Sequence, residues 1–293
     1  MREHVTGFMN YLRVEKQSSP ATLDQYGREL SRFFYYLEST EITEIAAVTT
    51  SILRSYLYRC KEKRNLSDNS LCTIIAILKS FFNYLFEEEV IKKNPGRKIH
   101  TPKKKKTCPR VMTRHEVDRI ISAVDFAPKR SRKNRCRDRL ILSLLYYTGV
   151  RKSELLHLNW DDINLSRSRM IIKSGKGKKD RVIPLHPKLI DLLDEYLTQR
   201  LPLKDPALIT GEMGKRLTAT SFSNLIRMYV KIAGLSKKSY SAHSFRHSFA
   251  THLVENGADI FSVQRLMGHA SLDSTRVYIN FTGERMAKVV ACL

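Results

Sequence analysis

The sequence predicts a mainly helical protein of two domains that carries one small β-hairpin. The chain has 293 residues, and domains commonly hold about 150 residues each. Apolar residues recur at helical spacing on both sides of a segment rich in proline and lysine. Two short runs of β-favouring residues interrupt the helical pattern in the second half of the chain.

The composition argues against a disordered, membrane-spanning or disulfide-stabilised protein. Hydrophobic residues make up 42% of the chain, which is enough to build a core. The longest uncharged segment, 140–150, is far shorter than the ~20 apolar residues of a membrane-spanning helix. The first residues carry charges with no apolar run behind them, so we expect no secretory signal and a cytoplasmic location. The 5 cysteines are scattered, which indicates neither disulfides nor a zinc-cysteine site.

The charge balance is the first indication of a partner. Lys and Arg number 52 against 29 Asp and Glu, giving a net charge of +23 and a sequence pI near 9.9. Such an excess favours nucleic acid, because Lys and Arg neutralise phosphates and release their counterions. An anionic membrane surface is the alternative, but it requires a basic amphipathic helix with exposed aromatic residues. No such helix is found, so we expect no membrane partner.

The first domain is expected to be a helical bundle over residues 1–94. Its strongest helix is predicted at 20–38, where Ser19 occupies the N-cap and Pro20 the first helical position. Further helices are predicted at 69–88, near 5–14 and at 51–60. Aromatic residues at 33–36 and 81–84 can stack on bases, but their helical spacing favours a core.

Residues 95–110 are predicted to be a basic linker that precedes a second domain over 111–293. Helical periodicity stops there, and Pro95, Pro102 and Pro109 keep the chain extended. Between them stand four adjacent lysines, Lys103, Lys104, Lys105 and Lys106. Adjacent lysines suit a strap that lies along DNA phosphates, and the alternative is a solvated tether.

The second domain is predicted to hold helices around a hairpin. A helix at 140–147 follows the basic stretch 129–139, which is either a loop or an extension of that helix, and Gly149 is its expected C-cap. A short helix is expected at 154–158, and Trp160 is expected in the core. The strands 170–173 and 182–185 flank a basic, glycine-containing tip. Later helices are predicted from about 189 and at 221–232, 242–255, 260–267 and 274–281.

The segment 241–253 is the most informative for chemistry. Phe245 and Phe249 belong to one buried stripe, which leaves His243, Arg246 and His247 beside it. At the helix start, backbone N–H groups, His243 and Arg246 can converge on a phosphate. His243 and His247 also stand one helical turn apart, as zinc ligands do. No glutamate lies between them, however, and Arg246 would repel a cation, so no metal is expected. A plain structural role for these histidines is the further alternative.

These residues belong to a series of motifs that resembles the tyrosine recombinase (phage-integrase, Xer-like) family. His243-x-x-Arg246 is followed by Leu266-Met267-Gly268-His269 and by Thr275-Arg276-Val277-Tyr278. Upstream, Arg151 and Glu154 follow Thr148-Gly149-Val150, as in the family's first arginine motif. Lys176, in Gly175-Lys176-Gly177, resembles the family's hairpin lysine.

The resemblance implies a C-shaped, two-domain DNA clamp with a helical core-binding domain and a catalytic domain. It implies that Tyr278 is the nucleophile and that Glu154 supports the site. The other catalytic residues it implies are Arg151, Lys176, His243, Arg246 and His269. Lys178, at the same hairpin tip, is a candidate DNA contact. Two features depart from the family pattern: the basic stretch 128–135 is longer than usual, and the tail after Tyr278 is short.

The chemistry of phosphodiester cleavage fits these residue types. Arg151 and Arg246 can each direct two N–H groups at phosphate oxygens, which lysine cannot do. His243 is the expected base or proton relay, and Lys176 the expected acid for the departing 5′-oxygen. A phosphotyrosyl ester conserves the energy of the broken bond, so neither ATP, a metal nor another cofactor is expected.

The function predicted from this resemblance is site-specific DNA recombination. It implies cleavage of double-stranded DNA to a 3′-phosphotyrosyl intermediate, followed by strand exchange through a Holliday junction. The assembly would be a homo-tetramer, or a hetero-tetramer with a related recombinase. Two alternatives stay open here: a type IB topoisomerase, which religates the original strand, and a non-catalytic DNA-binding protein.

Overall fold

The computed structural model describes residues 2–102, 110–128, 130–173 and 180–268. The chain divides into two compact units, residues 1–107 and 108–293. Each unit encloses its own cluster of buried apolar side chains. The architecture is mainly helical with one small antiparallel sheet, as the sequence predicts.

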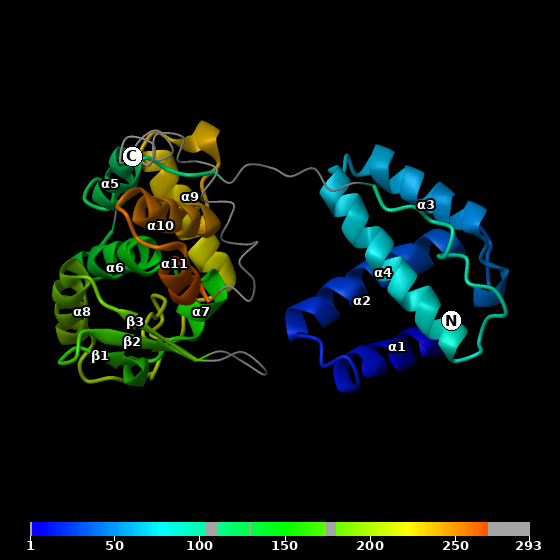
Figure 1. Ribbon diagram of the computed structural model, residues 1–293, viewed down its shortest axis with the longest axis horizontal. Coiled ribbons are helices and arrows are strands. Elements are labelled where there is room, and N and C mark those ends of the chain that lie inside the picture. The colour runs from blue at the N-terminus through cyan, green and yellow to red at the C-terminus, as the bar shows by residue number, and fades with distance from the viewer. Residues whose placement is uncertain (1, 103–109, 129, 174–179, 269–293) are drawn as a thin grey trace, which may run out of the picture. The chain divides into compact units, whose positions relative to one another are not determined.

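In the described part of the first unit there are four helices and one 3₁₀ turn, and the four helices were predicted from apolar spacing. They are α1 (Arg2–Val14), α2 (Pro20–Glu38), η1 (Ile45–Ala47), α3 (Thr50–Lys63) and α4 (Asp68–Glu87). The Oγ of Ser19 accepts a hydrogen bond from the Thr22 N–H at 3.2 Å, so Ser19 caps α2 as expected. Figure 1 shows α4 crossing α2 in this unit.

Several aromatic residues of the first unit form part of its core. Phe33, Phe81 and Phe82 are fully buried, whereas Tyr35 is 71% exposed. These phenylalanines pack edge to face, which aromatic rings favour. By length and composition alone, α4 could cross a membrane. Its buried face supplies much of this core, which accounts for its apolar character.

The beginning of the predicted linker packs against the first unit. The carbonyl of Pro95 accepts from Thr50 Oγ1 at 2.9 Å, and Cys72 Sγ lies 3.3 Å from the carbonyl of Pro102. Ile99, between the two, is buried. Residues 95–102 are therefore fastened to the helical unit and are not an extended tether. Lys103 to Lys106 lie outside the described residues.

The second unit arranges helices around a three-stranded sheet. Its helices are α5 (Arg114–Ser122), α6 (Arg132–Thr148), α7 (Lys152–His157), α8 (Pro187–Arg200), α9 (Ala219–Ile232), α10 (Ala242–Glu255) and α11 (Ile260–Met267), with 3₁₀ turns η2 (Trp160–Asp162) and η3 (Ser236–Lys238). Its strands are β1 (Ile163–Asn164), β2 (Arg169–Ile172) and β3 (Arg181–Pro184). Neither α5 nor β1 was predicted. The predicted helix at 274–281 and the hairpin tip 174–179 lie outside the described residues.

The basic stretch before residue 140 extends α6 rather than forming a loop. Ser131 caps the helix by accepting from the Asn134 N–H at 3.3 Å. The carboxylate of Asp138, which is fully buried, pairs with Arg137 at 2.7 Å and with Arg130 at 3.5 Å. This buried carboxylate offsets part of the positive charge, so a run of basic residues can begin a core helix.

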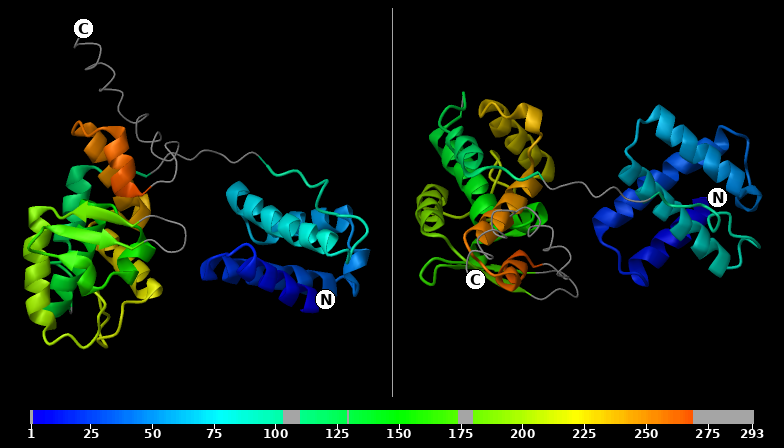
Figure 2. Two further views of the ribbon diagram at one scale, coloured as in Figure 1. Left: turned by 60° about the horizontal axis from the view of Figure 1, so that its bottom comes forward. Right: turned by 45° about the horizontal axis from the view of Figure 1, so that its top comes forward.

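The sheet presents one apolar face to the core, while α6 runs through the middle of the unit. The strands are antiparallel in the order β1-β2-β3, and Met170 is paired with Ile183. Met170, Ile172 and Ile183 are buried, and the sheet lies at the edge of the unit (Figure 2). α6 packs against α5, α8 and α10. Trp160 is buried, as predicted, and stacks on Tyr196 with ring centroids 6.1 Å apart.

Candidate active site

Arg151 is positioned by the tight turn that ends α6 and begins α7. Gly149 ends α6 with φ of +60°, a conformation that glycine adopts without steric cost. A Cβ at Gly149 would lie 2.3 Å from Cδ1 of Phe249, so this turn also needs glycine for its close packing. Arg151 then occupies the N-cap of α7, and its side chain keeps 31% of its surface exposed. The turn thus presents a guanidinium at the surface of the unit.

Glu154 holds Arg151 in place by two contacts. Its carboxylate accepts from the Arg151 backbone N–H and from Nη1, each at 2.7 Å. Arg181 of β3 donates to the same carboxylate. Burial alone would raise the pKa of Glu154, but hydrogen bonds from Arg181 and Arg151 lower it to about 2. Glu154 is therefore ionised at neutral pH and fixes the guanidinium of Arg151.

Arg246 of α10 joins two helix ends. Its neighbour Phe245 is fully buried, and Arg246 itself is only 4% exposed. Its Nη1 donates to the carbonyl of Gly149 and its Nη2 to the carbonyl of Met267, at the end of α11. Arg246 therefore lies beside the Arg151 turn, and it has a structural role that its place in the sequence motif did not indicate.

His243 lies in the same neighbourhood, in the first turn of α10. Partial burial is the largest cause that lowers its pKa, followed by the positive charges of Arg246, Arg151 and Lys152. His243 keeps an exposed surface, and the lowered pKa favours its neutral form. A neutral imidazole can accept a proton, which is the property required of a general base.

The residues at this site are suited to an anion rather than to a metal ion. Arg151, Arg246 and Lys152 bring three positive charges around His243. In the described ranges, no group of three His, Cys, Asp or Glu side chains is arranged to hold a metal ion. Paired guanidinium groups with a neutral imidazole are the donors that bind and activate a phosphodiester.

Comparison with known proteins decides the family. Residues 110–285 match the phage integrase family, and residues 5–89 match the N-terminal SAM-like domain of phage integrases. The chain is a tyrosine recombinase of the phage integrase family. As a member of this family, it is a site-specific recombinase that cleaves and rejoins DNA. The alternatives of a topoisomerase and of a non-catalytic binder are thereby set aside.

Full-length relatives and solved structures agree with this assignment. The recombinase is 36% identical to tyrosine recombinase XerC of Pelotomaculum thermopropionicum, over 99% of this chain and 97% of the relative. It is 32% identical to tyrosine recombinase XerD of Oceanobacillus iheyensis, over 96% and 95%. Its fold is similar to that of the XerH site-specific recombinase bound to palindromic difH substrate in a post-cleavage complex. That match has a TM-score of 0.76 and 25% identity, and it covers 98% of this chain and 84% of XerH.

The structure brings together four of the residues that the sequence singled out and leaves the others outside its description. Arg151, Glu154, His243 and Arg246 lie around the ends of α6 and α11. The predicted site residues that lie outside the described ranges are Lys176, Lys178, His269, Tyr278 and Lys103 to Lys106. The assignment of all of these as catalytic or DNA-binding residues stays a prediction.

Sequence reasoning missed Arg181, the second arginine on Glu154. A signal was present in the hairpin, because alternate residues of a strand share one face. Arg181 stands two residues before buried Ile183 and pairs with buried Ile172, so it occupies the core-facing side of β3. A charged residue at such a position requires a buried partner. Only the fold shows that this partner is Glu154.

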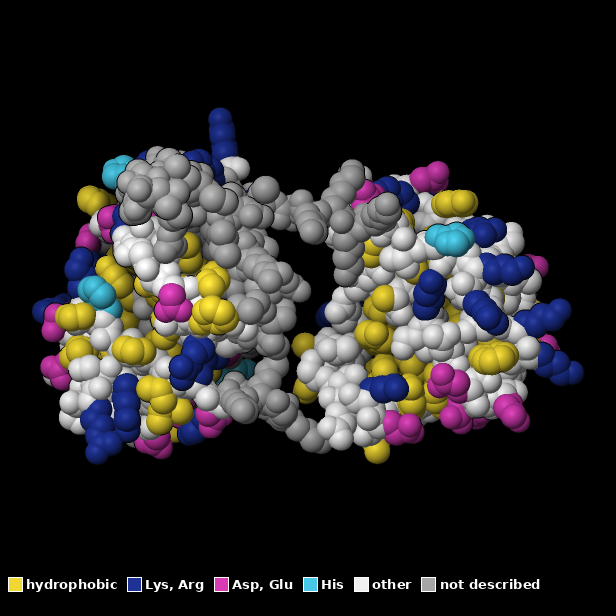
Figure 3. Space-filling view, viewed as in Figure 1, with side chains coloured by type: hydrophobic (Ala, Val, Ile, Leu, Met, Phe, Trp, Pro, Cys, Tyr) yellow, Lys and Arg dark blue, Asp and Glu magenta, His cyan; other side chains and the backbone are white. Residues whose placement is uncertain are grey.

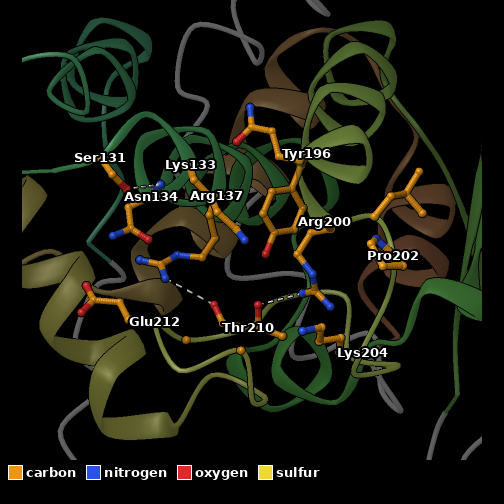
Figure 4. A pocket seen from close by; sticks show the side chains of 14 residues that line it. Ser131, Lys133, Asn134, Arg137, Tyr196, Arg200, Pro202, Lys204, Thr210 and Glu212 are labelled. Carbon is orange, nitrogen blue, oxygen red and sulfur yellow. Dashed lines mark hydrogen bonds between the residues drawn. The ribbon is translucent and has the colours of Figure 1, made fainter.

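Two cavities of the second unit differ in their relation to this site. A groove of about 510 Å³ between α9 and the start of α10 is lined by His243, Lys152 and Tyr240, among others, and so adjoins the site. A pocket of about 570 Å³ lies at the opposite end of α6, where Arg137 and Arg200 both contact Thr210 (Figure 4). This pocket is lined by residues at the start of α6, whereas Arg151 follows the end of that helix, so we assign the pocket no part in the reaction.

Proposed function

We propose that the recombinase cleaves double-stranded DNA with Tyr278 as nucleophile and forms a 3′-phosphotyrosyl intermediate. The hydroxyl oxygen of Tyr278 bonds to the scissile phosphorus and the bond to the 5′-oxygen breaks. His243 takes the tyrosine proton, and Lys176 gives a proton to the departing 5′-oxygen. Arg151, Arg246 and His269 stabilise the negative charge that grows on the phosphate oxygens.

The observation that carries this proposal is the convergence of Arg151, His243 and Arg246 from distant parts of the sequence. The guanidinium groups of Arg151 and Arg246 donate to the carbonyls of Gly268 and Met267, just before His269 in the chain, and both act on the pKa of His243. Tyr278 follows His269 by nine residues, as in the family motif. The short separation along the chain supports delivery of Tyr278 to the same phosphate.

We further propose that rejoining uses the 5′-hydroxyl of a partner strand. This hydroxyl attacks the phosphotyrosyl phosphorus and releases Tyr278, so the phosphodiester bond is restored without an external energy source. Exchange of one strand pair produces a Holliday junction, and exchange of the second resolves it. Two synapsed sites require four subunits, either identical or shared with a related recombinase. We propose that the reaction takes place in the cytoplasm.

The experiment that tests this proposal replaces Tyr278 by phenylalanine. The substrate is a labelled duplex with a nick in the spacer between two inverted repeats, taken from the DNA that flanks the gene. Y278F should bind it with the wild-type dependence on salt, because the phosphate-contacting cations are unchanged. It should form no covalent protein–DNA complex. The matched control is Tyr58→Phe, on α3, where the tyrosine is 67% exposed and the covalent complex should persist. Covalent capture by Y278F would contradict the assignment.

A further inference from the structure

The carboxylate of Glu154 is shared between two arginines from different elements. Arg151 reaches it from the start of α7. Arg181 reaches it from β3 with two N–H groups, at 3.0 Å to Oε1 and 2.7 Å to Oε2. Parallel contacts of this kind are the strong, directional form of an arginine–carboxylate pair. The Arg181 side chain is only 10% exposed and that of Glu154 13%, so solvent screens the pair weakly.

Arg181 also holds the end of α11. Its Nε donates to the carbonyl of Leu266 at 2.9 Å. The next two carbonyls, of Met267 and Gly268, accept from Arg246 and Arg151 respectively. The last carbonyls of a helix have no partner within the helix and carry its negative dipole end. Three successive carbonyls of α11 are thus bound by three arginines, which come from β3, α10 and α7.

The packing of Arg181 depends on a glycine. Gly268 has φ of +60°, and a Cβ there would lie 3.0 Å from Nη1 of Arg181 and 3.2 Å from its Cδ and Cζ. Nη1 and Cζ belong to the guanidinium group, and Cδ is the carbon bonded to it. The group is held by its hydrogen bonds to Glu154 and to the carbonyl of Leu266. The end of α11 therefore has the shape needed to receive this guanidinium in one orientation.

We propose that Arg181 is a positioning residue of the recombinase, which fixes the direction of the Arg151 guanidinium. The side chain of Arg151 makes two contacts, to Glu154 at 2.7 Å and to the carbonyl of Gly268 at 2.9 Å. Arg181 stabilises both of these contacts, because its guanidinium pairs with the carboxylate of Glu154 and packs against Gly268. This inference rests on the proposed contact of Arg151 with the scissile phosphate, and it adds a residue outside the motifs that define the site.

The kinetic consequence is a loss of rate rather than of binding. Without Arg181, the carboxylate of Glu154 is held from one side only, and the Leu266 carbonyl loses its donor. A displacement of about 1 Å in a catalytic group can cost on the order of 100-fold in rate. We expect Arg181→Gln to slow single-turnover formation of the covalent complex by about 10- to 100-fold. DNA affinity should change by less than about 3-fold, because the buried side chain contributes little to the exposed positive surface.

The first test therefore measures single-turnover cleavage and DNA affinity for Arg181→Gln and Arg181→Lys. Lysine keeps the charge but cannot make the forked contact, so R181K should also be slow. The control is Arg167→Ala, which removes an exposed arginine from the turn before β2 and should cleave at the wild-type rate. A purely structural role for Arg181 would lower the fraction of active protein while leaving the rate constant unchanged, and that result would overturn the proposal.

A second readout is the pH profile of cleavage. Arg181 provides the largest of the contacts that lower the pKa of Glu154, and burial acts in the opposite direction. Among the described residues, Arg151 is the other charged group that donates to this carboxylate, and the carbonyls at the end of α11 accept from both arginines. In R181Q the pKa of Glu154 should rise, so the rate relative to wild type should fall further below about pH 5. A Glu154→Gln/Arg181→Gln double variant should lack this additional fall. Parallel profiles for R181Q and wild type would count against the proposal.

A double-mutant cycle separates this inference from the proposed function. If Arg181 acts through Arg151, an Arg151→Ala/Arg181→Gln variant should cleave no more slowly than Arg151→Ala alone. Additive losses would show that Arg181 acts independently and would overturn the inference. Wild-type cleavage by Arg151→Ala would instead contradict the phosphate contact of Arg151. If R151A cleaves slowly but R181Q cleaves at the wild-type rate, the positioning role of Arg181 is contradicted and the phosphate contact of Arg151 stands.

Discussion

At the residue scale, Glu154 links the stability of the catalytic unit to its chemistry. Its pKa of about 2 in the folded protein lies below the ordinary value for glutamate. A depressed pKa means that the ionised carboxylate stabilises the fold at neutral pH. This contribution to stability is complete when the pH is above the ordinary pKa of glutamate. It is lost as the pH falls toward the pKa of Glu154 in the folded protein. Acid should therefore loosen the same contacts that orient Arg151.

Glu154→Gln should reduce stability at pH 7 and flatten its dependence on pH between about 4.5 and 2. The pKa difference corresponds to about 3 kcal/mol for the pH-dependent part of this loss. The measurement is chemical unfolding at a series of pH values. Glu116→Gln is the matched control, because Lys238, the Thr113 N–H and Tyr240 hold the pKa of Glu116 at about 2 as well. Both variants should flatten the profile, but only E154Q should slow cleavage by the folded protein. An unchanged pH profile for E154Q would contradict the assigned pKa.

Lys176 and Lys178 carry the same charge at the hairpin tip but are predicted to differ in role. An alkoxide needs a proton as it leaves, whereas a thiolate, with a pKa of about 8.5, can leave unaided. Lys176→Ala should strongly slow cleavage of ordinary DNA. Its cleavage rate should recover when sulfur replaces the 5′-bridging oxygen. Lys178→Ala should weaken binding and show little of that recovery. If K176A cleaves ordinary DNA and the sulfur-containing DNA with the same loss of rate, Lys176 is not the acid.

At the element scale, helix ends assemble the site. Gly149 is the C-cap of α6, Arg151 is the N-cap of α7, and Gly268 is the C-cap of α11. Both glycines have φ of +60°, and each is packed against a large side chain, Phe249 in one case and Arg181 in the other. These two glycines allow helix ends to approach closely enough for one arginine to bind carbonyls of both α6 and α11.

Gly149→Ala should destabilise the second unit far more than Gly214→Ala does. Both positions have positive φ, which costs about 1–2 kcal/mol for alanine. Nothing lies within 4 Å of a Cβ at Gly214, whereas one at Gly149 would overlap Phe249. The overlap should add about 1–3 kcal/mol, typical of overpacking. Chemical unfolding of the two variants measures the difference, and equal losses would mean that the turn relaxes around the new methyl group.

At the scale of the whole molecule, positive charge is the dominant property. The net charge of +23 is distributed over both units, and Figure 3 shows Lys and Arg side chains on the visible face of each. Acidic side chains lie on the same face of each unit. This distribution suits a protein that must hold a duplex regardless of its sequence before it reads a specific site.

Replacing Lys103 to Lys106 together by alanine should reduce the salt dependence of DNA binding. Each lost phosphate contact lowers the slope of log affinity against log salt by about 0.9. Four contacts would therefore lower it by up to about 3.6, whereas a solvated tether would leave it unchanged. Fluorescence anisotropy over a series of salt concentrations measures the slope. Lys188→Ala, at an exposed position of α8, is the control and should keep the wild-type slope.

The sequence by itself predicted most of the described helices, the two strands of the hairpin and the family. Local signals sufficed for these, because apolar spacing, N-cap residues and turn glycines act within a few residues of one another. The capping box of Thr113 and Glu116 was also readable, although α5 was not predicted from it. The motif residues Arg151, His243 and Arg246 could be chosen because their order along the chain is a property of the sequence.

Only the tertiary structure decided which charged groups meet. Arg181 and Glu154 are distant in sequence, and their pairing depends on where β3 lies against α7 and α11. The structural ties of Arg246 to Gly149 and Met267 have the same origin. Hydrogen bonds between guanidinium groups, carboxylates and helix-end carbonyls require separations near 3 Å. Such separations are set by the packing of whole elements, which no local pattern of residues encodes.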